Sequence, residues 1–244
     1  MTLLTINQKF RAARPPEAGH PPSENRLKVA EMFGIGLDET YEVALFDGLS
    51  IDARPGDVIY ITGPSGSGKS VLLGRLVSGL RAAWPEAAAT DLASITLDSD
   101  VPVIDRIAPP DGSGLALAEA LRVLSAAGLA DAFCLLRRPD ELSDGQRWRL
   151  RLALALAEAA PALGGPGERL LIADEFCSTL DRLCARAVAH RVRKLADDAG
   201  LTIVAASAHD DLAEDLDPDV LVVKHEGRCV EVLYRDAARR EATP

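Results

Sequence analysis

The hydrophobic positions along the chain follow two alternating patterns. Short apolar runs rich in β-branched residues are typical of strands buried on both faces of a sheet. The clearest runs are 58–62 (VIYIT), 169–173 (RLLIA) and 202–206 (TIVAA). Longer segments with an apolar residue every three or four positions predict helices over 71–83, 115–136 (one helix or a pair) and 143–160. Strands that alternate with helices predict an α/β fold with a mainly parallel sheet.

Weaker strand patterns lie at the ends and in the middle of the chain. They cover residues 2–6, 41–53, 95–97, 101–104, 220–223 and 229–233. The last two runs are separated by a short polar turn and predict a closing antiparallel hairpin. Residues 11–25 (RAARPPEAGHPPSEN) instead hold four prolines, which predicts a loop, and a short helix capped by Asn25 is expected to follow as far as Phe33.

Composition excludes several classes of protein. The chain has 244 residues, of which 48% are hydrophobic and 26% charged, as in ordinary globular domains. The formal net charge of −10 argues against broad nonspecific binding to nucleic acid or anionic lipid. No apolar run is long enough for a transmembrane helix, and the N-terminal order of charges is opposite to that of a signal peptide. Four cysteines without metal-ligand spacing (Cys134, Cys177, Cys184 and Cys229) indicate reduced thiols in a cytoplasmic protein.

A glycine-rich segment between the strand at 58–62 and the following helix carries the clearest chemistry. It fits the pattern GxxxxGK[ST] and consists of Gly63, Pro64, Ser65, Gly66, Ser67, Gly68, Lys69 and Ser70, with Val71 directly after it. Glycines let successive backbone N–H groups turn toward a phosphate, and the helix N-terminus adds partial positive charge. Lys69 is expected to reach the β- and γ-phosphates of a nucleotide, and the Ser70 hydroxyl to bind Mg²⁺. The segment therefore predicts ATP binding.

Four further motifs follow in a fixed order. They are LSDGQ at 142–146, the carboxylates Asp174 and Glu175 after an apolar strand, STLD at 178–181, and His209 after the strand at 202–206. In this order, over residues 41–225, the chain resembles the ATP-binding cassette (ABC) ATPases. The resemblance implies a P-loop fold of the ABC type, with a mainly parallel core sheet, antiparallel β elements and a small helical subdomain.

The resemblance also implies roles for these residues. Asp174 would hold Mg²⁺, Glu175 would orient or deprotonate the attacking water, and His209 would contact the γ-phosphate. Lys69, Glu175 and His209 are thus the expected catalytic residues. In the family a head-to-tail dimer encloses two ATP molecules, so Ser143 and Gly145 would complete the site of the opposite subunit and Asp181 would lie at the dimer contact. Ser143 is also expected to cap its own helix. Tyr41 stands where the family often has an adenine-stacking aromatic residue, although core packing accounts for it nearly as well.

Some features depart from the family pattern. Residues 95–100 (ITLDSD) replace the segment in which transporter cassettes carry a Gln, and Asp98 or Asp100 either reaches the metal or is an ordinary loop carboxylate. Only 74 residues separate Lys69 from Ser143, which implies a reduced helical subdomain at about 105–160. Phe176 stands where the family usually has Pro. We expect a single domain over residues 1–244, with a Pro-rich excursion and a short helix at 11–40.

The start of the helix at 143–160 has two interpretations. Residues 147–151 (RWRLR) are either a solvated basic face, which we favour, or a basic and aromatic patch for nucleic acid.

Three functions compatible with a Mg-ATP site remain open. We expect an ATP hydrolase that acts as a homodimer, most simply a cytoplasmic non-transport member with a soluble protein or nucleic-acid partner. The missing Gln, the reduced helical subdomain and the N-terminal excursion favour this interpretation. The alternative is the ATP-binding subunit of an ABC transporter, at the membrane periphery. A regulatory module that holds ATP without turnover is disfavoured by the presence of Glu175 and His209.

Overall fold

The computed structural model describes residues 2–11, 22–34, 42–97, 100–159 and 168–236. At its centre is a six-stranded sheet with the order β4-β5-β6-β3-β7-β8, in which all neighbouring pairs are parallel except β7 and β8. Its strands are β3 (Val58–Thr62), β4 (Ala88–Asp91), β5 (Arg169–Ala173), β6 (Thr202–Ala206), β7 (Val220–Lys224) and β8 (Val230–Tyr234). A second, antiparallel sheet consists of β1 (Thr2–Arg11) and β2 (Glu42–Ala53).

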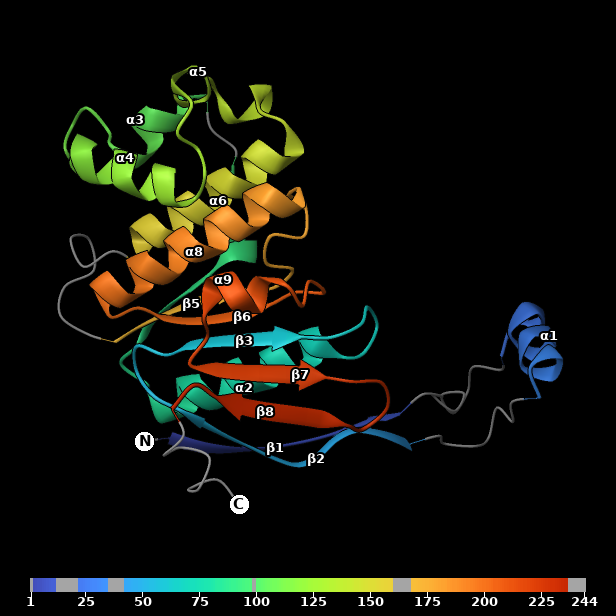
Figure 1. Cartoon of the computed structure of the whole chain (residues 1–244). Helices are drawn as coiled ribbons and strands as arrows, with labels where there is room; N and C mark the ends of the chain where they lie inside the picture. Colours follow the sequence, from blue (N-terminus) through green and yellow to red (C-terminus); the bar gives the residue numbers. More distant parts are fainter. Residues whose placement is uncertain (1, 12–21, 35–41, 98–99, 160–167, 237–244) are drawn as a thin grey trace.

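The helices cover both faces of the central sheet, as Figure 1 shows. On one face lies α2 (Lys69–Ala83), between the sheet and the β1–β2 pair; on the other lie α6 (Asp144–Glu158) and α8 (Arg182–Ala199). Beyond α6 and α8 are the short helices α3 (Val103–Ile107), α4 (Leu117–Ala126) and α5 (Ala132–Leu135). The other α-helices of the described residues are α1 (Glu24–Met32), between β1 and β2 in the chain, and α9 (Leu212–Leu216), between β6 and β7.

Alternate residues of the central strands enter two different cores. In β3, Val58 and Tyr60 pack in the cluster with α6 and α8, whereas Ile59 and Ile61 pack in the cluster with α2. Every residue of β3, β5 and β6 is buried, because each of these strands is covered on both faces. The mainly parallel α/β sheet, the three doubly buried strands and the closing hairpin are confirmed.

The strand predictions around residue 100 are wrong. Residues 95–97 have no regular structure, and the β-branched run at 101–104 contributes to helix α3, which starts after Pro102 and buries Val103 and Ile107 one turn apart. The edge strand is β4 instead; its sequence AATD has one β-branched residue, Thr90, among Ala and Asp residues that are depleted in strands. The predicted short helix exists as α1, but Ser23 caps it rather than Asn25, since the Ser23 hydroxyl accepts from the Arg26 N–H at 3.3 Å.

The structure also describes the state of the cysteines and the character of the helices. All four cysteines lie in the described part of the chain and are free. None of the helices within the described residues combines the length and the apolar character that crossing a lipid bilayer requires.

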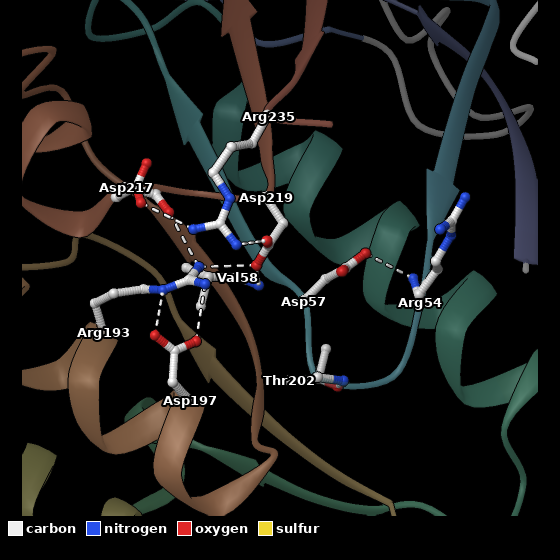
Figure 2. A network of polar contacts seen from close by, with 10 residues as sticks. Arg54, Asp57, Val58, Arg193, Asp197, Thr202, Asp217, Asp219 and Arg235 are labelled. Carbon is white, nitrogen blue, oxygen red and sulfur yellow. Dashed lines mark hydrogen bonds and ion pairs between the residues drawn. The ribbon is translucent and has the colours of Figure 1, made fainter. Parts of the chain in front are cut away.

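A network of charged side chains ties the starts of β3 and β7 to α8 at one edge of the sheet (Figure 2). Arg193 of α8 is almost fully buried and pairs with Asp197 and Asp219 at 2.8 Å each. The Asp219 carboxylate also accepts from the Val58 N–H at 2.9 Å and pairs with Arg235 at 2.6 Å. Beside this network, the Gly56 N–H donates to the Thr202 hydroxyl at 2.8 Å. Together these bonds hold the starts of β3, β6 and β7 in register.

We expect Asp219→Asn to destabilise the protein by about 2 kcal/mol at neutral pH, because it leaves a buried guanidinium short of its counter-charge. Burial by itself raises the pKa of the Asp219 carboxyl, but the hydrogen bonds from Arg193 and Val58 and the nearby positive charges outweigh burial and hold this pKa below its ordinary value. The stabilisation is therefore complete above the ordinary Asp pKa of about 3.9 and is lost as the pH falls through the lowered value.

Urea unfolding of the two proteins from neutral pH down to about pH 3 measures this difference. The control is Asp144→Asn, which breaks the exposed Asp144–Arg147 pair and is expected to change stability by less than about 0.5 kcal/mol. A difference between wild type and Asp219→Asn that stays constant into acid would contradict the assignment.

Candidate functional site

The candidate site lies where β3, β5 and β6 end. Because these strands are parallel neighbours, the loops that follow them leave the sheet at one edge. These loops and the start of α2 enclose a cavity of about 340 Å³. It is lined by Ser65, Gly66, Gly68, Lys69, Ser70, Val71, Asp174, Glu175, Ser178, Ala206, Ser207 and Ala208. Residues more than a hundred positions apart in the chain therefore share one pocket.

Two glycines of the glycine-rich loop have a backbone conformation that disfavours any larger residue. Gly63 has a φ of +142°, and a Cβ atom added there would lie 1.9 Å from the carbonyl oxygen of Lys224 in β7. Gly68 has a φ of +99° and caps the N-terminus of α2. The loop is thus pressed against the end of β7 and then turns directly into α2, so that the helix N-terminus faces the cavity.

Two polar side chains of this loop point to an anionic ligand. The Lys69 ammonium lies over the loop and donates to the carbonyl oxygens of Gly63 and Pro64 at 2.8 and 2.7 Å. The Ser67 hydroxyl is a buried oxygen that has no hydrogen-bond partner among the described residues. A loop that offers a cation, a hydroxyl and a helix N-terminus is suited to a phosphate group.

The carboxylates after β5 line the same cavity. Asp174 is half-buried, and its carboxylate accepts from the Glu175 N–H at 2.9 Å. Glu175 is exposed and has a φ of +50°, a conformation that costs a non-glycine residue about 1 kcal/mol. The Ser178 hydroxyl lies 3.5 Å from the Glu175 carboxylate. The structure therefore brings Asp174 and Glu175 together with Lys69 and Ser70.

His209 lies beside this cavity without lining it. Its N–H donates to the Ser207 hydroxyl at 3.3 Å, and its carbonyl oxygen accepts from the Tyr60 hydroxyl. Burial raises the pKa of the Tyr60 phenol well above its ordinary value, so Tyr60 stays a protonated donor. The loop after β6 is thus fixed by β3, next to the glycine-rich loop.

Ser143 and Gly145 do not line the cavity of their own chain. Ser143 caps α6 as expected: its hydroxyl accepts from the Gln146 N–H at 3.3 Å, and the Gln146 side chain accepts from the Ser143 N–H at 2.9 Å. Asp144 pairs with Arg147 at 2.6 Å, so its charge is partly compensated within the helix. Asp181 caps α8 in the same way, since its carboxylate accepts from the Cys184 N–H at 3.0 Å.

The donors at the cavity fit a magnesium ion that keeps most of its ligands as water and phosphate. Ser70 and Asp174 supply a hydroxyl and a carboxylate oxygen to the same pocket. Among the described residues there is no cluster of three or more His, Cys, Asp or Glu side chains that would hold a metal by themselves. Mg²⁺ is typically bound through one or two protein oxygens together with substrate phosphates. Ser70 and Asp174 provide two such oxygens.

The basic start of α6 does not form a stacking surface for bases. Trp148 is 7% exposed, and its ring packs edge-to-face on Phe176. Arg149 is used within the fold, where it donates to the carbonyl oxygens of Gly145 and Gly128. These contacts favour the structural interpretation of residues 147–151 over a patch for nucleic acid.

Some predicted residues lie outside the described part of the chain, and some residues at or beside the cavity escaped prediction. Tyr41 and Asp98 belong to the first group, and Asp100 is exposed. Ser207 and Tyr60 were not identified as site residues, because neither belongs to a motif. Their position at or near the carboxyl ends of β6 and β3, next to recognised motifs, is the signal that points to them.

The chain is similar to several ATP-binding proteins, although no family model matches it. The lipoprotein-releasing system ATP-binding protein LolD of Novosphingobium aromaticivorans is 31% identical over 207 residues, which cover 74% of this chain and 87% of that protein. The phosphonates import ATP-binding protein PhnC of Hyphomonas neptunium is 30% identical over 213 residues, with coverage of 74% and 77%. The Fe(3+) ions import ATP-binding protein FbpC of Pseudomonas fluorescens is 32% identical over 195 residues, with coverage of 70% and 52%.

Solved structures show the same fold at lower identity. The dimeric structure of MJ0796, a bacterial ABC transporter cassette, aligns with a TM-score of 0.56 and 18% identity over 78% of this chain and 91% of that one. A post-hydrolysis dimer of MJ0796 with bound ADP and Pi aligns with a TM-score of 0.55 and 19% identity, at the same coverage. This likeness shows an ABC cassette fold.

We expect Gly63→Ala to be far more harmful than Gly66→Ala. Both glycines have positive φ, but a Cβ at Gly63 would overlap the Lys224 carbonyl, whereas a Cβ at Gly66 meets nothing within 4 Å. Gly66→Ala should therefore cost about 1 kcal/mol of stability from backbone strain alone, and Gly63→Ala about 3 kcal/mol, because β7 or the loop must also move. Thermal unfolding of the two variants checks the prediction, and equal midpoints would show that Gly63 is not held against β7.

Proposed function

The chain belongs to the ATP-binding cassette (ABC) family of ATPases, and on that premise we propose that it is the ATP-binding subunit of a membrane transporter. It is an ATP hydrolase of the P-loop class. The observation that carries the details of the site is the cavity that gathers Lys69, Ser70, Asp174 and Glu175 from two distant stretches of the chain. The roles that follow for single residues are our proposal.

The transporter role replaces the soluble role that the sequence alone favoured. The three relatives named above are described as ATP-binding proteins of a releasing or import system, and MJ0796 is a transporter cassette. Nothing among them supports a non-transport protein or nucleic-acid partner. The missing Gln and the reduced helical subdomain are then variations within a transporter cassette.

ATP binds with its phosphates along residues 63–70. Backbone N–H groups of the loop and the N-terminus of α2 surround the β-phosphate, and the Lys69 ammonium neutralises the β- and γ-phosphates. Pro64, Ser65 and Val71 complete the wall of the loop. Tyr41 remains a prediction for stacking on the adenine.

The Ser70 hydroxyl and the Asp174 carboxylate would hold Mg²⁺. When bound, the ion would neutralise charge on the phosphate oxygens. Asp174 is suited to this role because it stands at the end of a buried strand, and its backbone neighbour, the Glu175 N–H, fixes one of its oxygens.

Glu175 orients the water that attacks the γ-phosphate and accepts its proton. Glu175 lines the same cavity as Lys69, and its backbone has a φ of +50°. His209 contacts the γ-phosphate from the loop after β6. This loop is anchored by the Tyr60 hydroxyl, so the imidazole is carried by a fixed backbone.

Each site is completed by a second copy of the chain in a head-to-tail homodimer. Ser143 and Gly145 are at the N-terminus of α6, do not line the cavity of their own chain, and would supply N–H and hydroxyl donors to the γ-phosphate of the partner. The dimer of MJ0796 is a precedent for such an assembly in this fold.

The membrane subunit docks in a groove between the segment after β4 and the start of α6. This groove has a volume of about 940 Å³ and is lined by Ala93, Ile95, Thr96, Leu97, Asp100, Pro139, Asp140, Arg147 and Arg151. It includes the segment in which transporter cassettes contact their membrane partner. Arg151 is exposed and offers a positive charge to a partner segment.

Glu175→Gln should keep ATP binding but lower turnover by about 100-fold or more, because the amide cannot accept a proton. ATP should then hold the variant as a dimer on size-exclusion chromatography.

Lys69→Ala should instead lose ATP binding. Phosphate release and equilibrium binding of ATP measure the two properties separately, and EDTA should abolish turnover of the wild type. Normal turnover in Glu175→Gln would refute its role.

A tagged Glu175→Gln chain with Mg-ATP, recovered from detergent-solubilised cells of the source organism, should bring down a polytopic membrane protein. Arg151→Glu in this background should reduce the yield of that protein by about tenfold, since it reverses a charge in the groove. Arg75→Glu reverses a charge on exposed α2 residue Arg75, on the other face of the sheet, and should leave the yield unchanged. Recovery of only soluble protein or nucleic acid would contradict the transporter role and support a non-transport ATPase.

A further inference from the structure

The turn that carries Glu175 has a strained backbone at two residues, one on each side of Phe176. Glu175 has a φ of +50° and Cys177 a φ of +60°, and Phe176 lies between them. Asp217 is the remaining non-glycine residue with positive φ within the described residues. Two left-handed residues in a run of three persist only where the surrounding structure holds them. Phe176 is the residue through which that hold acts.

Phe176 is anchored by its backbone and by its ring. Its N–H donates to the carbonyl oxygen of Ala206, the last residue of β6, at 2.7 Å. Its side chain is 1% exposed, and Cys177 after it is fully buried. Pro, which the family usually has here, has no N–H and could not make the bond to Ala206. The anchor is therefore a property of this chain's own residue.

The Phe176 ring meets Trp148 of α6 edge-to-face. The ring centroids are 5.8 Å apart and the planes are inclined by 67°, a favourable geometry for an aromatic pair. Trp148 is 7% exposed and lies in the second turn of α6, the helix capped by Ser143. One aromatic contact thus joins the helix that begins at Ser143 to the residue next to Glu175.

A second contact joins the same two segments. A Cβ atom added at Gly145 would lie 3.6 Å from the Leu180 side chain and 3.7 Å from the Thr179 carbonyl oxygen. The start of α6 is therefore in van der Waals reach of the chain that follows Cys177. The start of α6 is thus joined to the turn at 175–177 and to the residues after it by direct packing.

We propose that Phe176 and Trp148 are positioning residues for the Glu175 carboxylate: the aromatic pair fixes the strained turn after β5 and couples its position to helix α6. The proposal rests on the proposed function, in which Glu175 orients the attacking water. Ser143 at the start of α6 is expected to face the ATP of the partner protomer. The aromatic pair then couples the docking of Ser143 on the partner's ATP to the position of the Glu175 carboxylate in the same chain.

A purely structural role for the pair makes a different prediction. Truncation of a buried aromatic residue would then lower the unfolding temperature and leave the turnover of each folded molecule unchanged. A positioning role instead lowers kcat while the affinity for ATP stays the same, because neither Phe176 nor Trp148 lines the cavity that takes the phosphates. The split between kcat and KM separates the two roles.

The test measures ATP turnover and ATP binding of the full chain in Phe176→Leu, Trp148→Leu and the double variant. Phe176→Leu should lower kcat by about tenfold or more, with KM and the dissociation constant of ATP within about twofold of wild type. Trp148→Leu should act in the same direction. The double variant should fall to about the level of the worse single variant rather than to the product of the two effects, because both remove one contact.

The matched control is Trp84→Leu. Trp84 is a tryptophan of similar burial (9% exposed) in the other hydrophobic core, at the far end of α2. It should lower the unfolding temperature and keep kcat. If Phe176→Leu does not fold, the comparison of Trp148→Leu with Trp84→Leu tests the same prediction.

The outcomes distinguish this inference from the function on which it rests. Loss of turnover in Glu175→Gln together with wild-type kcat in folded Phe176→Leu and Trp148→Leu overturns the positioning role alone. Wild-type turnover in Glu175→Gln removes the role of Glu175 and, with it, the positioning role. Loss of kcat in Trp84→Leu equal to that in Trp148→Leu would show a general effect of core truncation and also overturn the proposal.

Discussion

The parallel pairing of β3 with β6 and of β6 with β5 is the constraint on which the site depends. Backbone hydrogen bonds place these three strands side by side in one direction, so the loops after Thr62, Ala173 and Ala206 must leave the sheet at the same edge. At the opposite edge, the network around Asp219 and Arg193 holds the strand starts. The ends of β3, β5 and β6 at the cavity are therefore positioned by the sheet itself.

Residues at the site edge then use conformations that the scaffold has to hold. Gly63 is pressed against the carbonyl of Lys224, and Glu175 sits in a left-handed conformation next to a buried aromatic anchor. Such strained positions are typical of sites in which a reacting group must be preorganised. In this chain the anchor for Glu175 comes from Phe176 and Trp148, so the core between the sheet and α6 contributes directly to the geometry of the carboxylate.

The departures from the family pattern lie mostly away from the cavity. The segment after β4 lines the groove in which we place the membrane partner, and α1 lies in the connection between β1 and β2. From the sequence alone, such departures favoured a soluble role. Similarity to ATP-binding proteins of release and import systems instead favours a transporter subunit. Loss of a single motif residue says little about the partner, because the partner recognises a surface formed by several segments.

The sequence by itself determined the α/β class, the three doubly buried strands, the glycine-rich loop and the order of motifs around Asp174, Glu175 and His209. Each of these is written in a local pattern: β-branched runs, glycine spacing, or carboxylates after an apolar strand. The sequence missed β4 and misassigned residues 101–104, since an Ala-Ala-Thr-Asp edge strand and a β-branched helix contradict local propensity and are decided by packing. Only the tertiary structure revealed that Phe176 packs on Trp148, that Lys224 closes on Gly63 and that Tyr60 holds the carbonyl of His209. These contacts join residues far apart in the chain, and no local pattern encodes a distance between two such residues.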